Sequence, residues 1–273
     1  MKTLFKAMAL LAMCGMVFFA CSTQDEVNPN QPEPDAVPAD VIDKLNSLGF
    51  NTVDMPVIGV DNGYIVERDI FIGFDDLNNI GEGKGITEEH YSTTNLVTGL
   101  PRTINVFVSG SFQSQYFTAT DNAIARYNAE SLQLTFARVT SASAADISIV
   151  PSPWWYRFFG ILGSAGFPTA GGDPFNQIQL TTAFYNNVTD LGALTTTIAH
   201  EMGHCIGMRH TDYMDRSFSC GGATDNEGDG GVGANYIPGT PTGPEAGSWM
   251  LACSDGTDRP FTSGDQTALA FLY

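Results

Sequence analysis

The stretch that decides the fold is His-Glu-Met-Gly-His-Cys-Ile-Gly-Met-Arg-His, residues 200–210. On an α-helix, His200 and His204 lie one turn apart on the same face, so both imidazoles can reach one metal ion with Glu201 beside them. Gly207 favours the left-handed conformation that ends a helix, which lets the chain turn sharply and return His210 as a third ligand. Three neutral nitrogens with one open position are typical of a catalytic zinc site, whereas structural zinc sites are closed by four protein ligands.

Three of the four histidines in the chain, together with Glu201 and Gly207, satisfy the long pattern His-Glu-x-x-His-x-x-Gly-x-x-His. Ordinary histidines that fall at this spacing by chance are the alternative, and the length of the pattern counts against it. The pattern resembles that of the metzincin zinc endopeptidases, a family with a tight turn that carries a methionine beneath the metal. The triplet Ser-Trp-Met that ends at Met250 lies downstream of His210, so the resemblance implies a Met-turn there.

The chain is more closely similar to the bacterial branch of the HEIGH-type metallopeptidases, a family named for its His-Glu-Ile-Gly-His. This similarity rests on residues 200–220, on residues 248–253 and on the closing Ala-Phe-Leu-Tyr, with Met202 in place of the isoleucine. It implies an α+β fold, a zincin or metzincin-like catalytic domain with a twisted mixed sheet, an active-site helix and a Met-turn. We expect this catalytic domain to span residues 101–273.

Local patterns in this domain predict strands and helices in the order that metzincins use. The expected strands are residues 104–108, 132–139, 145–150 and 177–182. Thr120 or Asp121 can cap a helix that runs through Glu130, and the metal helix is expected to start near Thr189 or Asp190. In the family, the strand that corresponds to residues 177–182 lies at the sheet edge above the cleft, where a peptide can add as an antiparallel strand.

An aromatic run, Trp-Trp-Tyr-Arg-Phe-Phe at residues 154–159, lies in a glycine-rich connection. It could form a rim for the substrate or pack a large loop against the sheet. We favour packing, because aromatic side chains bury about 150–250 Å² each and mostly serve the core.

Residues 1–20 are typical of a signal peptide, with Lys2 and Lys6 before an apolar core too short to span a bilayer. The sequence Phe-Phe-Ala-Cys that ends at Cys21 resembles a loose bacterial lipoprotein signal, and the acidic residues 24–26 resemble the surface-export signals of Bacteroidetes lipoproteins. We therefore expect lipidation of Cys21 and a surface-exposed protein anchored to the outer membrane of a bacterial cell envelope. Because two phenylalanines are unusual there, an ordinary secretory signal and a secreted or periplasmic protein are the alternative.

Residues 21–40 are polar and rich in proline, which predicts a lipid-attached tether. The segment 41–100 is less informative. Its apolar positions 41, 45 and 48 can line a short helix that ends at Gly49, and residues 63–72 are typical of one strand. We interpret the segment as an accessory or propeptide-like one, with a permanent structural collar as the competing interpretation. It contains no cysteine that could bind zinc as a thiolate, and His90 is expected in a solvated loop.

The formal net charge is −18, and removal of the signal peptide takes away two lysines and no acid, which makes it −20. This charge argues against nucleic acid and anionic lipid as partners and favours solubility. Asp225, Glu227 and Asp229 could hold Ca²⁺ together with backbone carbonyls. Their spacing matches no recognised calcium loop, however, and we favour a solvated loop for them.

Besides Cys21, three cysteines remain after processing, and export to an oxidising compartment favours disulfide formation. Cys205 is expected on the buried face of the metal helix, while Cys220 and Cys253 lie in loops that flank the site. We predict a bridge between Cys220 and Cys253 that pins the long loop against the Met-turn and leaves Cys205 as a thiol.

These features predict an extracytoplasmic zinc endopeptidase that acts on protein or peptide substrates as a monomer. One catalytic Zn²⁺ would be bound by His200, His204 and His210, with Glu201 as the general base and Met250 beneath the site. A surface binding or adhesion lipoprotein that keeps the metzincin fold with little turnover is the alternative. Such a protein would have no need of Glu201 beside the metal.

Overall fold

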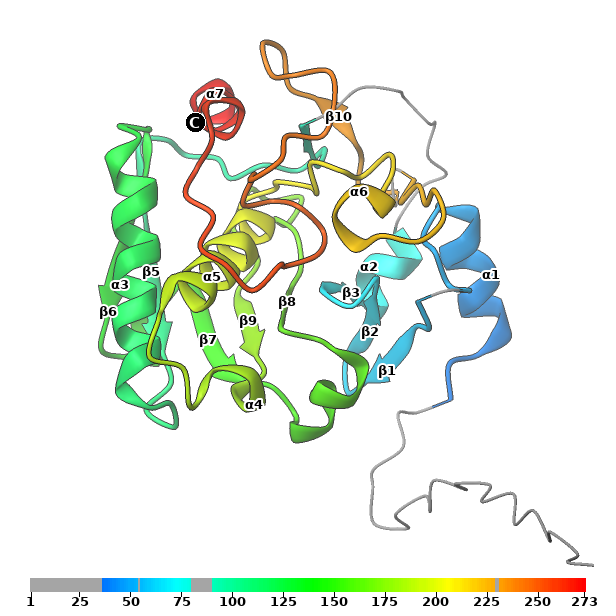
Figure 1. Cartoon of the computed structure of the whole chain (residues 1–273), viewed down its shortest axis with the longest axis horizontal. Coiled ribbons are helices and arrows are strands. Elements are labelled where there is room, and N and C mark those ends of the chain that lie inside the picture. Colours follow the sequence, from blue (N-terminus) through cyan, green and yellow to red (C-terminus); the bar gives the residue numbers. More distant parts are fainter. Residues whose placement is uncertain (1–35, 54, 80–89, 229–230) are drawn as a thin grey trace, which may run out of the picture. The chain divides into compact units, whose positions relative to one another are not determined.

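The computed structural model describes residues 36–53, 55–79, 90–228 and 231–273, which belong to one compact unit, Glu33–Tyr273 (Figure 1). The predicted signal peptide, Cys21 and residues 21–35 of the predicted tether lie outside the described residues. Helix α1 begins at Ala39, so the predicted tether ends two residues earlier than expected. In the part of the chain that is described, no helix is long and apolar enough to cross a membrane.

The described residues contain both helices and a mixed sheet, as the α+β prediction requires. The helices are α1 (Ala39–Ser47), α2 (Phe74–Asn79), α3 (Ser114–Ala129), α4 (Thr182–Tyr185), α5 (Gly192–Cys205), α6 (Ser217–Cys220) and α7 (Ser263–Leu272), with 3₁₀ turns η1 (Ala142–Ala144) and η2 (Trp154–Phe159). The strands are β1 (Ile58–Val60), β2 (Gly63–Val66), β3 (Ile70–Gly73), β4 (Tyr91–Ser92), β5 (Arg102–Val108), β6 (Leu134–Val139), β7 (Ile147–Pro151), β8 (Gly163–Ala165), β9 (Gln177–Leu180) and β10 (Asn235–Tyr236).

Eight of these strands form one sheet in the order β1-β2-β3-β8-β9-β7-β5-β6, and β4 pairs separately with β10. Strands β9, β7, β5 and β6 are parallel to one another, whereas β8 is antiparallel to β9. Alternate residues of β5, namely Ile104, Val106 and Val108, are buried, which is the period of a strand with one face on the core. Helices α3 and α5 pack against each other and against this sheet (Figure 1).

Two predicted elements of the catalytic part differ from the structure. Helix α3 begins at Ser114, six residues before Thr120, and the Thr120 hydroxyl donates to the Tyr116 carbonyl at 2.8 Å inside the helix instead of capping it. Strand β9 lies between β7 and β8, so residues 177–182 do not form a sheet edge. Within the catalytic part, the strand next to β9 on the side of the N-terminal hairpin is the short β8. It has no alternating apolar pattern from which it could be predicted.

The N-terminal segment contains the predicted helix, α1, which buries Leu45 and Leu48 and is followed by Gly49 at φ 99°. The single strand predicted for residues 63–72 is wrong. The chain turns at Glu67 and Arg68, which have φ of 54° and 77°, and β2 and β3 pair as an antiparallel hairpin. Three charged residues interrupt the apolar run at this point, and they form the turn.

This hairpin extends the main sheet. Ile70 of β3 pairs with Ala165 of β8 in parallel, and the Ala165 amide donates to the Asp69 carbonyl at 3.0 Å. Behind the strands, Ile58 and Ile65 pack with Tyr156 and Ile161 in a small apolar cluster. Residues 58–73 are therefore packed against the catalytic part through both main-chain hydrogen bonds and buried side chains.

The aromatic run of η2 has a buried part and an exposed part. Tyr156 is buried, in agreement with the packing interpretation. Trp154 and Phe158 are 49% and 52% exposed, and the guanidinium of Arg157 lies over both of their rings. Only the inner part of the run therefore packs the loop.

Candidate metal centre

Helix α5 carries the first two histidines, and the turn that ends it returns the third. The Met208 amide donates to the Gly203 carbonyl at 2.9 Å, and the Gly207 amide donates to the His204 carbonyl at 2.9 Å. Gly207 has φ 102°, and a Cβ there would lie 2.8 Å from a methyl of Leu96. Only glycine fits this position, so the sharp turn that brings back His210 depends on it.

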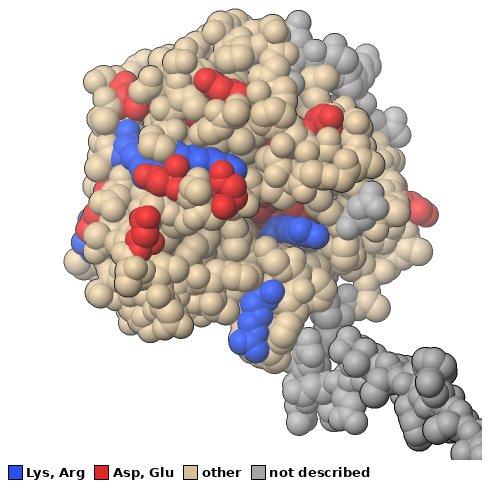
Figure 2. Space-filling model, viewed as in Figure 1, with Lys and Arg blue, Asp and Glu red and all other residues tan. Residues whose placement is uncertain are grey.

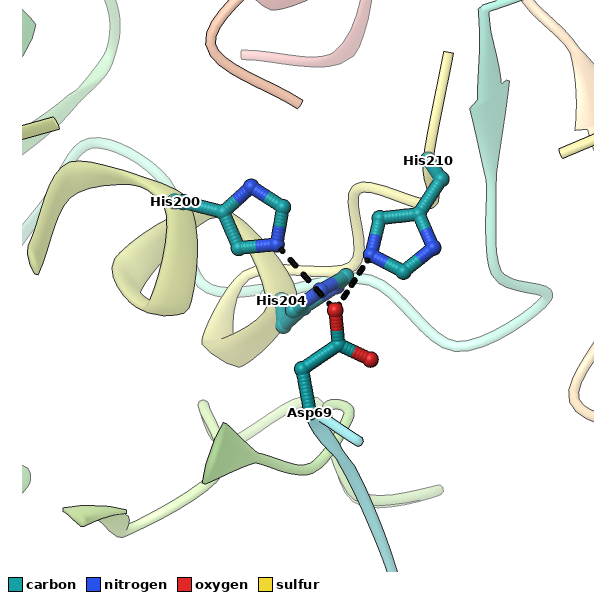
Figure 3. A group of neighbouring side chains, drawn as sticks. All are labelled: Asp69, His200, His204 and His210. Carbon is teal, nitrogen blue, oxygen red and sulfur yellow. Dashed lines mark ion pairs between the residues drawn. The ribbon is translucent and has the colours of Figure 1, made fainter. Parts of the chain in front are cut away.

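The three imidazoles face one another around a common centre (Figure 3). Their ring centroids are 4.7 to 5.2 Å apart. The Nδ1 atoms bond outward, His200 to the Trp249 carbonyl at 2.8 Å and His204 to the Met208 carbonyl at 2.9 Å. Because a carbonyl only accepts, these Nδ1 atoms carry the hydrogen, and the Nε2 lone pairs point to the centre as metal ligation requires.

The predicted Met-turn lies directly against α5. A Cβ on Gly203 would be 2.6 Å from the Met250 sulfur, so the missing side chain of Gly203 lets the sulfur approach the helix. The Trp249 indole nitrogen donates to the Ala199 carbonyl at 3.1 Å, and Ser248 donates to Asp265 at 2.6 Å. The turn thus holds His200 through Trp249 and is itself tied to α7.

His90 belongs to this support and not to a solvated loop, so that expectation is wrong. The side chain is fully buried, with Nε2 3.2 Å from Asp265 Oδ1. Asp265 also completes a capping box with Thr262 at the start of α7. His90, Glu245 and Asp265 offer atoms close enough for a metal ion. The oxygens of Asp265 are already used by Ser248, Thr262 and His90, however, which indicates a structural role.

Glu227 holds the third histidine. It is fully buried, and its Oε1 lies 2.5 Å from His210 Nδ1 and 2.8 Å from Arg216 Nη1. Its second oxygen accepts from Arg209 Nη2 at 3.2 Å. The solvated loop expected here is therefore wrong for Glu227, and nothing supports calcium because its oxygens face cations of the chain. Asp229 lies outside the described residues.

A carboxylate that the sequence analysis did not single out also reaches the centre. Asp69, at the end of the β2–β3 turn, directs its Oδ2 to within 3.0 Å of His210 Nε2 and 3.9 Å of His200 Nε2 (Figure 3). Asp69, His200, His204 and His210 offer atoms that all lie within 4.8 Å of one another.

The donors present fit a bound divalent cation. Among the described residues, Nε2 of His204, Nε2 of His210, Oδ1 of Asp69 and Oε2 of Glu201 are buried without a hydrogen-bond partner. Buried polar atoms normally find such a partner, so four of them in one place indicate a missing ligand. Imidazole nitrogens with a carboxylate oxygen are the donor types that zinc takes.

The electrostatics of the centre follow from burial and from the two carboxylates. Burial, followed by the charge of His210, lowers the pKa of His200 to about 4, and burial lowers that of His204 well below its usual value. Burial would lower the pKa of His210 as well, but Glu227 and Asp69 raise it to about 10. His200 and His204 are thus neutral, as metal ligands must be, and the carboxylates attract positive charge to the third position.

Glu201 lies beside the centre with 2% of its surface exposed. Burial, followed by repulsion from Asp69, raises the pKa of Glu201 well above its usual value. Gly163 of β8 makes room for it, because a Cβ there would lie 2.6 Å from Glu201 Oε1. A cavity of about 270 Å³ opens next to it, lined by His200, Glu201 and Arg259 among others.

The surface above the sheet and helices carries few charges. On the face in Figure 2, basic and acidic side chains lie next to each other, and charged groups of both signs meet at a hollow near the middle of the view. The cavity beside Glu201 likewise has lining residues of both signs, Arg216 and Asp69 among them.

One of the three cysteines of the catalytic part, Cys253, lines the same cavity. Cys220 at the end of α6 and Cys253 after the Met-turn form a disulfide with a sequence separation of 33. Cys205 is buried in α5 as a free thiol. The Cys253 amide also donates to the Ser219 hydroxyl at 2.9 Å, so the loop and the Met-turn are joined by both kinds of bond.

Sequence reasoning found the histidines and Glu201 because they form one short pattern. It missed Asp69, which lies far from that pattern in the chain, and it did not connect Arg216 or Glu227 with the histidines although both follow the pattern more closely. The charged triplet that ends at Asp69 inside an apolar run was the one available signal, and it marks a turn.

A known protein family and several solved structures are similar to this chain. A family profile described as "Dual-action HEIGH metallo-peptidase" matches residues 64–273, a range that includes the β2–β3 hairpin. No curated protein matches the chain. Among solved structures, "Crystal structure of myroilysin" is 14% identical with a TM-score of 0.42, covering 75% of this chain and 98% of that one.

A second myroilysin structure is 12% identical with a TM-score of 0.41, covering 65% of this chain and 82% of that one. High choriolytic enzyme 1, a hatching enzyme zinc-protease from Oryzias latipes (medaka fish), is 15% identical with a TM-score of 0.31, covering 57% and 74%. The family match spans most of the chain and contains all the residues of the candidate centre. The chain therefore belongs to the HEIGH metallo-peptidase family, a family of zinc metallopeptidases.

Proposed function

We propose that the chain is a zinc-dependent endopeptidase that hydrolyses peptide bonds of proteins, with His200, His204 and His210 as zinc ligands. The observation that carries the proposal is the convergence of three imidazoles on a buried centre with Glu201 beside it. Membership of a metallopeptidase family supports the same class of reaction.

Bound zinc would supply Lewis-acid chemistry, which polarises a scissile carbonyl and acidifies a water molecule. Glu201 would accept the proton of the attacking water on its free Oε2 and pass it to the leaving amine. Trp249 and Met208 would keep the first two imidazoles in their ligating orientation through the Nδ1 hydrogen bonds.

We further propose that the enzyme works outside the cytoplasm as a monomer, anchored by a lipid on Cys21 to the outer surface of a bacterial envelope. The signal-like residues 1–20 and Cys21 support this, and the Cys220–Cys253 disulfide is typical of an oxidising compartment. If Cys21 is acylated, Cys21→Ser should release the protein from the membrane fraction. Finding the unmodified chain wholly soluble would exclude the anchor.

The catalytic proposal is tested by zinc content and peptide hydrolysis measured together. We expect hydrolysis that a chelator abolishes, loss of zinc in His204→Ala, and retained zinc with lost turnover in Glu201→Ala. Both measurements are made in the wild-type chain and in Asp69→Ala, because Asp69 faces the centre. Zinc binding without hydrolysis in either chain would favour the alternative, a binding lipoprotein of the same fold.

A further inference from the structure

We propose that Asp69 is a fourth ligand of the metal centre and that the hairpin tip, residues Glu67, Arg68 and Asp69 between β2 and β3, keeps the centre closed in the full-length chain. The proposal rests on the zinc site proposed above and adds its regulation. Both interpretations of the N-terminal segment are compatible with it, since a segment that supplies a ligand must move or be removed before a substrate can bind.

Asp69 meets the centre with an atom that a ligand would use. Its Oδ2 lies 3.0 Å from His210 Nε2 and 3.9 Å from His200 Nε2. Two atoms bound at about 2.1 Å to one tetrahedral ion lie about 3.4 Å apart, so the two distances lie on either side of that value. Nε2 of His210 has no hydrogen-bond partner among the described residues despite the short contact. Asp69 Oδ2 and His210 Nε2 are therefore placed as two ligands of one ion and not as a hydrogen-bonded pair.

The hairpin tip is fixed in this position by its neighbour Glu67. Glu67 is fully buried, and its Oε2 accepts from Arg216 Nη1 at 3.1 Å while its carbonyl accepts from Arg216 Nη2 at 3.1 Å. The Asn51 amide donates to its other oxygen at 3.1 Å. Glu67 and Arg68 both have positive φ, a conformation that non-glycine residues rarely adopt. Two buried anchors, Glu67 and Asp69, thus hold a turn of unusual conformation against the centre.

The hairpin also occupies the surface that a peptide needs. Strand β8, whose Gly163 lies against Glu201, pairs with β3 on the side away from β9, and its Ala165 amide already donates to the Asp69 carbonyl. Glu67, Arg68 and Asp69 line one wall of the cavity whose other walls carry His200 and Glu201. A substrate that adds to β8 by main-chain hydrogen bonds would need this same amide. Hairpin and substrate cannot both be bound.

The family match begins at Tyr64 and so includes the hairpin tip. The hairpin is therefore a regular part of this kind of domain, and its strands pack through Ile58 and Ile65 against Tyr156 and Ile161. We infer a built-in closure that opens by movement or cutting of the hairpin.

Metal coordination tests the assignment without relying on turnover. Cobalt(II) replaces zinc, and its visible absorption reports the ligand set in the wild-type chain, in Asp69→Ala and in Asp69→Asn, which keeps the side-chain shape. The matched control is Asp61→Ala, because Asp61 is an exposed acid at the other turn of the same strands. The affinity for a small hydroxamate, which must take the fourth position, is measured by calorimetry in all four chains.

We expect the absorption spectrum to change and hydroxamate affinity to rise at least tenfold in both Asp69 variants, with no change in Asp61→Ala. Identical spectra and affinities within twofold across the four chains would overturn the proposal, as would failure of the wild-type chain to take up cobalt. Peptide hydrolysis separates the two proposals. Equal hydrolysis by wild type and Asp69→Ala contradicts closure alone. A changed spectrum without hydrolysis in any chain supports Asp69 as a ligand and contradicts the proposed peptidase activity.

Discussion

Gly163→Ala should impair catalysis without removing the metal. Gly163 lies in β8 and pairs with Leu180 of β9, and its φ is not positive, so the backbone itself accepts alanine. A Cβ at this position would lie 2.6 Å from Oε1 of Glu201 and 3.0 Å from its Cγ and Cδ. Glu201 is almost completely buried, so its carboxylate cannot swing into solvent to relieve the contact.

The size of the effect follows from these distances. Ordinary contact begins at 3.4 Å, so the carboxylate must move by about 0.8 Å. A misplacement of about 1 Å can cost on the order of 100-fold in rate, because the base must stand within hydrogen-bond reach of the proton it takes. We expect kcat/KM to fall by roughly 30 to 100-fold, which corresponds to about 2 to 2.7 kcal/mol of transition-state stabilisation.

The assay is kcat/KM on a quenched fluorescent peptide, with zinc content and melting temperature measured on the same samples. Each substitution is made in the wild-type chain and in Asp69→Ala, and rates are compared within one background. Gly110→Ala is the matched control, since its added Cβ would meet no atom within 4 Å and its φ is not positive. Full zinc content with a rate within twofold of the parent in Gly163→Ala would refute the assigned position of Glu201.

Glu201→Gln should keep its zinc and lose about 100 to 10,000-fold in turnover because the general base is absent; a rate near that of the parent would remove Glu201 from the mechanism. Cys220→Ser with Cys253→Ser should lower the free energy of unfolding by about 3.7 kcal/mol, given the sequence separation of 33, as measured by urea denaturation under non-reducing conditions. Gly203→Ala should lower zinc affinity although alanine favours helices, because its Cβ would meet the Met250 sulfur at 2.6 Å; an unchanged zinc dissociation constant would contradict this role of the Met-turn. Chelation should lower the melting temperature of the wild-type chain more than that of His204→Ala, since a bound ion stabilises only the folded state.

Local patterns in the sequence predicted much of the fold. The strands near residues 104–108 and 145–150 alternate apolar and polar residues, and α5 follows from the spacing of His200 and His204. The start of α3 was missed although Tyr116 continues the buried spacing of Ala123 and Tyr127, because Thr120 and Asp121 are typical capping residues and predict the first turn at their own position. Strand β8, Gly163–Ala165, has only small residues, and neighbouring strands alone make it a strand.

The candidate centre was predictable only where its residues are close in sequence. His200, Glu201, His204 and His210 share one helix and its terminal turn, so their mutual geometry follows from helix periodicity. Asp69 reaches them from a turn more than a hundred residues earlier, and its run of sequence resembles an ordinary strand. His90 gave the opposite error, because a polar stretch of sequence hides its burial against Asp265.

The residues that orient the histidines also connect the centre to the hairpin tip. Arg216 donates through Nη1 to both Glu67 and Glu227, and Glu227 bonds His210 Nδ1. When the hairpin leaves, Arg216 loses Glu67 but keeps Glu227, and Arg209 continues to pair with Glu227 as well. His210 would therefore stay oriented in the open state, because the group that holds it belongs to the catalytic part. Opening removes Asp69 from the Nε2 side of His210 and leaves Glu227 on the Nδ1 side. His210 can therefore keep its orientation toward the metal in both the closed and the open state.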